Sequence, residues 1–362
     1  MKHSAVLIIL AISLVLFPLT FVETAEANSE EIGLVIKKRL SHYNREYPHT
    51  RFVHLDGGDD WYSDMVAVMT VLGHDPIALD YQHPPDVANE LMALTIERLK
   101  RMLMADIVSA TAFRPGQGSL IKRKHLCVVT LNPRAFVAND YAATQYMLDL
   151  NDSTMKKVHP VRYLNHLDHL LFTIDHEVFH CLHTIQYGGI PMTHLPFGGE
   201  YHLFQRESAA DAYAMAIHLR SRGEVTQYAR NITHVRALWL FTDSPNRDTF
   251  ETLREVLIVN PKKLSRMQEK ELVGWAINIT KRTVRPYHKY VHQRAAALKA
   301  ARTLGMIPEL YGERWHECEK KVKVDPKLVA HLVNRYRYYY EHLFTAERLA
   351  LDAPPLIDAL ER

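Results

Sequence analysis

The 362-residue sequence predicts an α+β fold that is mostly helical. From residue 163 onward, long stretches rich in helix-forming residues alternate with isolated breaks at Pro or Gly, which is typical of consecutive helices. The stretch His125–Leu131 is instead apolar and β-branched, and Asn132 and Pro133 end it, so we predict a strand there. We therefore expect a small N-terminal sheet followed by a helical C-terminal half.

Residues 1–27 have the composition of a signal peptide. Lys2 precedes an almost wholly apolar run, and Ala25 and Ala27 are small residues of the kind that a signal peptidase recognises. The alternative is an uncleaved N-terminal membrane anchor, although the run is near the lower limit for spanning a bilayer and contains Pro18. We expect cleavage, a secreted or periplasmic mature protein, and no stable membrane span after the signal is removed.

Charge and cysteine content narrow the possible functions. A formal net charge of +3 is too small to indicate nucleic acid as a partner. Three cysteines make an odd number, which argues against a disulfide framework but allows one disulfide in an oxidising compartment. Cys181 is expected to pack in the core rather than to bind a metal ion.

The expected elements follow from local patterns. In the N-terminal part, Ala135–Asn139 follows the predicted strand as a short extended segment, which is either an edge strand that binds a substrate backbone or part of a simple hairpin. The predicted N-terminal helices are Glu30–Tyr47, Asp64–Val71 and Asp86–Thr111. The predicted C-terminal helices are Leu164–Tyr187, Tyr201–Arg222, Val225–Phe241, Asp248–Val259, Arg266–Arg282, Tyr287–Leu304 and Lys327–Glu347.

The first predicted C-terminal helix contains the string His-Glu-Val-Phe-His. A helix turns about 100° per residue, so His176 and His180 lie one turn apart on one face and can reach one ion of the size of zinc. Glu177 is next to the first histidine and can approach a water molecule at that ion. Ile174, Val178, Phe179 and Cys181 are uncharged, as suits a helix that is buried on its remaining faces. An amphipathic core helix with incidental histidines is the alternative.

A second pair of polar residues follows on the next predicted helix. Glu207 and Asp211 are four residues apart, so their carboxylates share a face. One can bind the metal ion, and the other can accept a hydrogen bond from a ligand histidine and so determine its tautomer. Between them, Ala209 and Ala210 are small enough to let two helices approach closely. A solvated helix charge is the alternative for Glu207.

This string, followed by a helix with Glu-x-x-x-Asp, resembles the gluzincin group of zinc metallopeptidases. The resemblance implies a zincin-like catalytic core in which Zn²⁺ is bound by three side chains. It also implies a general base and an outer carboxylate that supports a ligand histidine. Carried over to this chain, the implied ligands are His176, His180 and Glu207, the base is Glu177, and the outer carboxylate is Asp211.

The resemblance covers residues 168–218 and leads to a division of the chain into a signal peptide, 1–27, a zincin-like catalytic region, 28–222, and a helical C-terminal region, 223–362. The metzincin pattern is a poor match, because it requires Gly and His where this chain has His183 and Gln186. His169 and His183 are each seven residues from His176, or about 10.5 Å along a helix, so neither is expected to join the site.

The expected function is that of an exported zinc-dependent metallopeptidase that acts on a peptide or protein substrate, with Glu177 as the general base. Two alternatives remain at this point. One is a zincin fold that binds a partner without proteolysis, and the other is a helical exported binding protein without a metal ion. The presence of Glu177 speaks against the first alternative, because a site without catalysis needs no base.

Overall fold

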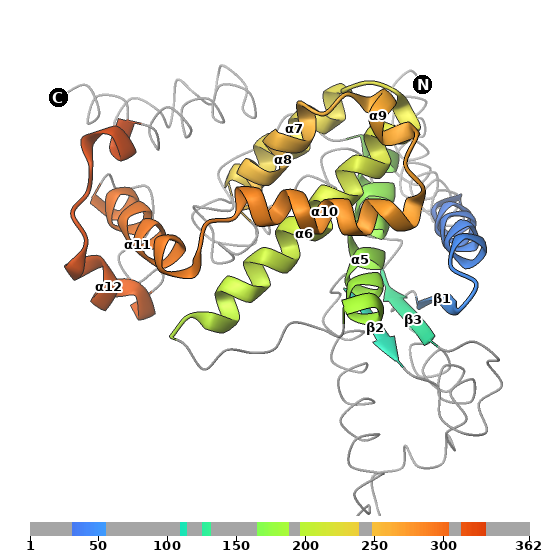
Figure 1. Cartoon of the computed structure of the whole chain (residues 1–362), viewed down its shortest axis with the longest axis horizontal. Helices are drawn as coiled ribbons and strands as arrows, with labels where there is room; N and C mark the ends of the chain where they lie inside the picture. Colours follow the sequence, from blue (N-terminus) through green and yellow to red (C-terminus); the bar gives the residue numbers. More distant parts are fainter. Residues whose placement is uncertain are drawn as a thin grey trace, which may run out of the picture. The chain divides into compact units, whose positions relative to one another are not determined.

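The computed structural model describes residues 31–55, 109–113, 125–131, 165–187, 196–238, 248–303 and 313–330 (Figure 1). Most of these residues are helical, which confirms the mostly helical α+β class, and the zincin-like core stays a prediction. The chain forms two compact units, one of residues 1–109 and 114–142 and one of residues 110–113 and 143–362. The predicted boundary between residues 222 and 223 falls within the second unit.

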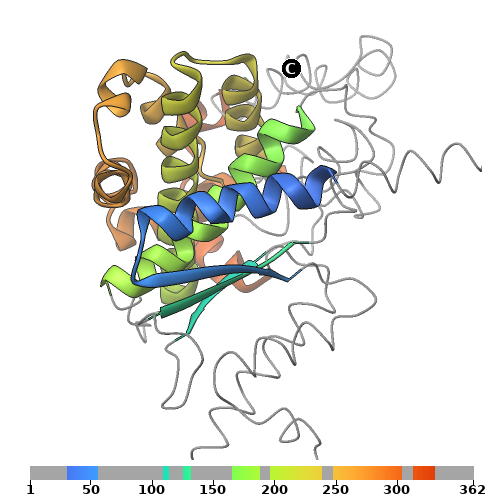
Figure 2. The same ribbon diagram turned by 90° about the vertical axis from the view of Figure 1, so that its right-hand side faces the viewer.

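In the first unit, the helix 31–46 lies beside two parallel strands, β1 (Thr50–Leu55) and β3 (His125–Thr130) (Figure 2). The Asn44 side chain holds the start of β1 by donating to the Phe52 carbonyl and accepting from the Phe52 amide, both at 3.0 Å. The Tyr43 and Phe52 rings pack with their centroids 5.6 Å apart. The apolar side chains of β3 are buried, as expected for a strand of a parallel sheet.

The strand order of the sheet is β1-β3-β2, with β2 formed by Ser109–Phe113. The prediction of β3 is confirmed, but β1 was not anticipated. The predicted helix Asp86–Thr111 is wrong at its end, because its last three residues belong to β2. A strand forms through pairing with a distant segment, and the local pattern of residues cannot report that pairing. The other residues of this helix lie outside the described part of the chain, as do Asp64–Val71 and Ala135–Asn139.

The second unit contains the helices predicted between Leu164 and Leu304, most with ends within about three residues of the expected ones, while most of the predicted helix Lys327–Glu347 lies outside the described part of the chain. A short helix, α9, was not anticipated; it begins at Pro261, and the Asn260 side chain accepts a hydrogen bond from the Lys262 amide as its N-cap. The 3₁₀ turn η5 and the helix α12 were also missed. The helical elements are α5 (His166–Tyr187), α6 (Gly198–Arg222), α7 (Gln227–Leu238), α8 (Phe250–Leu257), α9 (Pro261–Ser265), α10 (Glu269–Thr283), α11 (Tyr287–Thr303), η5 (Glu313–Trp315) and α12 (His316–Lys321).

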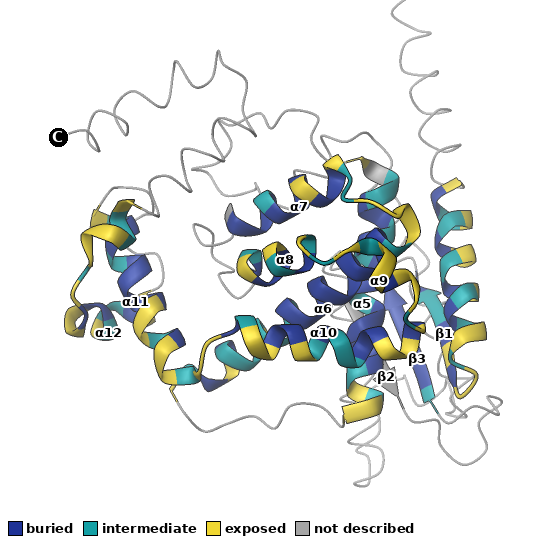
Figure 3. Cartoon of the chain, turned by 45° about the horizontal axis from the view of Figure 1, so that its top comes forward, coloured by how far each residue is buried: buried dark blue, intermediate teal, exposed yellow. Residues whose placement is uncertain are grey.

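Helix α6 is the centre of the second unit, because α5, α8, α9 and α10 all pack against it (Figure 3). Nearly every residue from Ser208 to Leu219 is inaccessible to solvent, so this part of α6 is buried on all sides. The small side chains of Ala209 and Ala210 lie in this stretch, in agreement with the predicted close packing of two helices. The polar residues of the stretch therefore need partners inside the protein.

Both ends of α6 have backbone in the left-handed region. Gly223 (φ 74°) ends the helix, and its amide donates to the Leu219 carbonyl, an arrangement that a residue without Cβ adopts without strain. Phe197 (φ 61°) precedes the helix and is strained there as a non-glycine residue. Its ring stacks on Trp315 with a centroid separation of 4.1 Å, and this packing holds the residue in place.

The predicted signal peptide, residues 1–27, lies outside the described part of the chain. Within the described residues, none of the helices combines the length and the hydropathy that crossing a bilayer requires. Cys127 and Cys181 are buried and disulfide-bonded, whereas Cys318 is free and partly exposed. Cys181 is thus a buried core residue and not a free thiol beside His180.

Candidate metal centre

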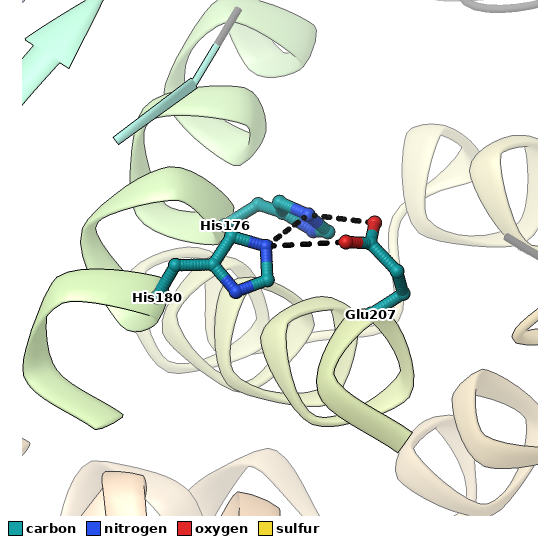
Figure 4. Close-up of side chains that lie close together, drawn as sticks. All are labelled: His176, His180 and Glu207. Atoms are coloured by element: carbon teal, nitrogen blue, oxygen red, sulfur yellow. Dashed lines mark hydrogen bonds and ion pairs between the residues drawn. The ribbon is translucent and has the colours of Figure 1, made fainter. Parts of the chain in front are cut away.

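Helix α5 presents two imidazoles from one of its faces. His176 and His180 are one turn apart, and they retain only 5% and 8% of their exposure. Between them, Val178 and Phe179 are fully buried and anchor α5 in the core. The two rings therefore extend from a backbone that apolar packing holds in place, and their Nε2 atoms face each other at 3.2 Å (Figure 4).

Helix α6 brings the Glu207 carboxylate to the same point. Its Oε2 lies 3.3 Å from Nε2 of His176, and its Oε1 lies 3.4 Å from Nε2 of His180 (Figure 4). Two atoms bound to a tetrahedral zinc ion at about 2.0–2.1 Å are about 3.3 Å apart. The three separations are close to this value, with the two contacts of Glu207 made by different oxygens, so the three side chains lie close enough together to bind a single ion.

The outer nitrogen of His176 is held by Asp211, which lies one turn after Glu207 on α6. Nδ1 of His176 donates to Oδ1 of Asp211 at 2.7 Å. When the ring is neutral, as a metal ligand must be, this hydrogen bond keeps its proton on Nδ1 and leaves the lone pair on Nε2, the nitrogen that faces Glu207. No such partner holds the outer nitrogen of His180, because Nδ1 of that ring is buried without a hydrogen bond. The residues expected as ligands and outer carboxylate are thus brought together.

Two further residues hold Asp211 and were missed by the sequence analysis. Arg236 of α7 contacts both carboxylate oxygens, and the hydroxyl of Thr249, at the N-cap of α8, donates to Oδ2. These residues are 25 and 38 positions from Asp211 in the sequence. No motif spacing links them to the histidines, so only the packing of α7 and α8 could reveal their role.

Burial and the neighbouring charges shift the pKa values of His176 and Glu207 in opposite directions. Burial by itself lowers the pKa of His176, but the charges and hydrogen bonds of Asp211 and Glu207 outweigh it and raise the pKa to about 9. Burial would raise the pKa of Glu207, but its hydrogen bonds to both histidines hold it well below the usual range. Glu207 is therefore an ionised carboxylate, and a metal ion that binds here takes the place of a proton between the rings.

The other residues considered from the sequence lie in different surroundings. Glu177, the expected base, is half-buried beside His176 on α5 and is not one of the three converging side chains. His169 is buried, with Nδ1 3.1 Å from the Tyr228 hydroxyl. His183 stacks between Phe179 and Tyr187, with centroid separations of 5.7 Å and 5.6 Å. Neither of these two histidines belongs to the group of His176, His180 and Glu207, which is called the triad below.

The buried histidines outside the triad lead to a prediction about pH. Burial and the charge of Arg236 lower the pKa of His169 from 6.5 to about 3, and burial lowers the pKa of His218 to about 4. Below pH 6.5 the unfolded chain takes up protons that the folded protein excludes, so the free energy of unfolding should decrease between pH 6.5 and 4. Each ring contributes about 1.4 kcal/mol per pH unit.

This decrease is measured by urea unfolding of the metal-free protein at several pH values. In the variant His169→Gln, the free energy of unfolding should depend less steeply on pH over the same range, because unfolding then takes up about one proton fewer. A variant with the same slope as the original protein would show that His169 titrates normally in the folded state.

In the part of the chain that the structure describes, one group of three His, Cys, Asp or Glu side chains could hold a metal ion. It consists of His176, His180 and Glu207, with one candidate ligand atom from each residue and all atoms within 4.8 Å of one another. Comparisons with protein families, with curated proteins and with solved structures found no match. The metal centre is therefore inferred from its geometry and chemistry alone.

Proposed function

We propose that this protein is an exported zinc-dependent metallopeptidase of the gluzincin type. The observation that carries the proposal is the convergence of two Nε2 atoms and a carboxylate at separations of 3.2–3.4 Å. Two imidazoles and one carboxylate are a donor set of catalytic zinc sites, in which a further position stays open. The Asp211 hydrogen bond to His176 supports the same reading, because metal-bound histidines nearly always donate their outer N–H to such a group.

The residues present suit zinc better than a harder cation. Imidazole nitrogen is a preferred ligand of zinc, whereas magnesium and calcium prefer oxygen ligands throughout. The site is also largely closed to solvent, since His176 and His180 are almost fully buried. The two Nε2 atoms lie 3.2 Å apart beside the ionised Glu207 carboxylate, so the arrangement favours a cation there, which is a proton in the metal-free site or a metal ion.

Zinc, when bound, supplies a Lewis acid that polarises a substrate carbonyl and makes a water molecule more acidic. His176, His180 and Glu207 hold the ion, and Asp211 maintains the orientation of the His176 ring. Glu177 accepts a proton from the attacking water molecule and delivers it to the amine that leaves when the peptide bond breaks. The proposed substrate is therefore a peptide or a protein.

The proposal is tested on purified full-length protein by elemental analysis and by hydrolysis of a casein-type substrate. We expect about one zinc per chain, loss of hydrolysis on treatment with a chelator, and recovery when zinc is restored. A protein without bound metal would instead be a helical exported binding protein. A protein that holds zinc but hydrolyses no peptide in a broad screen would be a zincin fold without proteolysis.

A further inference from the structure

Asp211 joins four helices at one buried point. It is fully inaccessible to solvent and belongs to α6, while its partners belong to α5, to α7 and to the N-cap of α8. A buried carboxylate needs partners for its charge and for its lone pairs, and here both oxygens have two each. This arrangement determines more than the tautomer of one histidine.

The contacts divide evenly between the two oxygens. Oδ1 of Asp211 accepts from Nδ1 of His176 at 2.7 Å and from a terminal nitrogen of Arg236 at 2.8 Å. Oδ2 lies 2.7 Å from Nε of Arg236 and accepts from the Thr249 hydroxyl. Arg236 thus holds the carboxylate with one hydrogen bond, from its terminal nitrogen to Oδ1, and with an ion-pair contact of Nε to Oδ2 that is not a hydrogen bond.

The position of Asp211 makes such restraint necessary. Asp211 and Glu207 are one turn apart on α6, and Asp211 already touches a ring that Glu207 touches. An aspartate released from Arg236 would keep only the hydrogen bonds from His176 and Thr249 and would have no charged arginine partner, so the ion would become the cation that attracts it. Binding there would fill the position that a catalytic site keeps open.

We propose that Arg236 is a positioning residue that keeps Asp211 out of the coordination sphere, so that the metal ion receives two imidazoles and a single carboxylate from the chain. This inference rests on the proposed function, since it concerns the same metal centre. Thr249 assists by occupying Oδ2. Metal affinity and coordination number at the site are therefore set by α7 and α8, which contribute no ligand.

The test compares Arg236→Met with Arg236→Lys and with Arg220→Met. Arg220 lies in α6 and contacts a buried carboxylate, that of Glu269, at 3.7 Å, so Arg220→Met removes a similar ion pair without affecting Asp211. Zinc affinity is measured by competition with a chromophoric chelator, and coordination by the visible absorption of the cobalt(II) form, whose intensity falls as the coordination number rises.

We expect Arg236→Met to reduce the cobalt absorption, because Asp211 then joins the metal ion as a further ligand. Arg236→Lys should restore part of the absorption, and Arg220→Met should leave it unchanged, while the zinc competition shows that each variant still holds the ion. Unchanged absorption in Arg236→Met would overturn the inference, as would an equal loss in Arg220→Met.

If Arg236→Met does not fold, Arg236→Lys and Thr249→Val decide the question. Thr249→Val removes only the hydroxyl that donates to Asp211 and nearly preserves the volume. Lower cobalt absorption in these variants supports the inference, and the original absorption in both overturns it. A full-length protein that binds zinc normally but hydrolyses no peptide would contradict the proposed function while leaving this test intact.

Discussion

Glu177→Gln should retain zinc and lose peptide hydrolysis by a factor of about 10²–10⁴, the range associated with removal of a general base. The reason is that an amide of nearly the same shape cannot accept the proton that the carboxylate accepts. Zinc should stay bound because the three converging side chains are His176, His180 and Glu207, and Glu177 is not among them. The rate is measured on a casein-type substrate, and zinc by elemental analysis of the same sample.

A matched control for this variant is Glu251→Gln on α8. Glu251 is about half exposed and pairs with Arg254 on the surface of the same helix, so its loss should change neither zinc content nor rate. Hydrolysis by Glu177→Gln at the original rate would show that the proposed base is not used. Loss of zinc in that variant would instead assign Glu177 to metal binding.

Glu207→Gln and Glu207→Ala should weaken zinc affinity by more than about 100-fold, which is the largest loss expected when a residue that only supports a ligand is removed. The carboxylate is the only anionic member of the triad and lies within 3.4 Å of both Nε2 atoms. The glutamine variant preserves the volume of the side chain, so its effect isolates the charge. Affinity is measured by chelator competition, as for the variants of Arg236.

The same loss should be visible in protein stability. Zinc at about 1,000 times its dissociation constant should raise the free energy of unfolding of the original protein by about 4 kcal/mol, because the ion binds only the folded state. In Glu207→Gln this increase should largely disappear. Unfolding by urea with zinc and with a chelator gives both values. Persistent zinc binding would contradict Glu207 as a ligand and direct attention to Glu200, His202 or Asp211.

The local sequence pattern was sufficient to predict α5 and α6, the two helices that carry the triad. Uninterrupted helix-forming residues marked α5 and α6, and the one-turn spacing of His176 and His180 placed two rings on one face. The same reasoning was wrong for Ser109–Phe113, where a predicted helix end is a strand. It also missed β1, whose residues become a strand by pairing in register with β3. Pairing energy comes from a partner segment far away in the sequence.

Helical periodicity, which follows directly from the order of residues, was enough to identify His176, His180, Glu207 and Asp211 as candidate residues of a metal site. The packing of the helices was needed to show that Glu207 meets both rings and that Arg236 and Thr249 contact Asp211. The physical reason is that spacing along one helix is a local property of the backbone. The approach of α6, α7 and α8 to that helix depends instead on how buried apolar surfaces and buried charges are satisfied together.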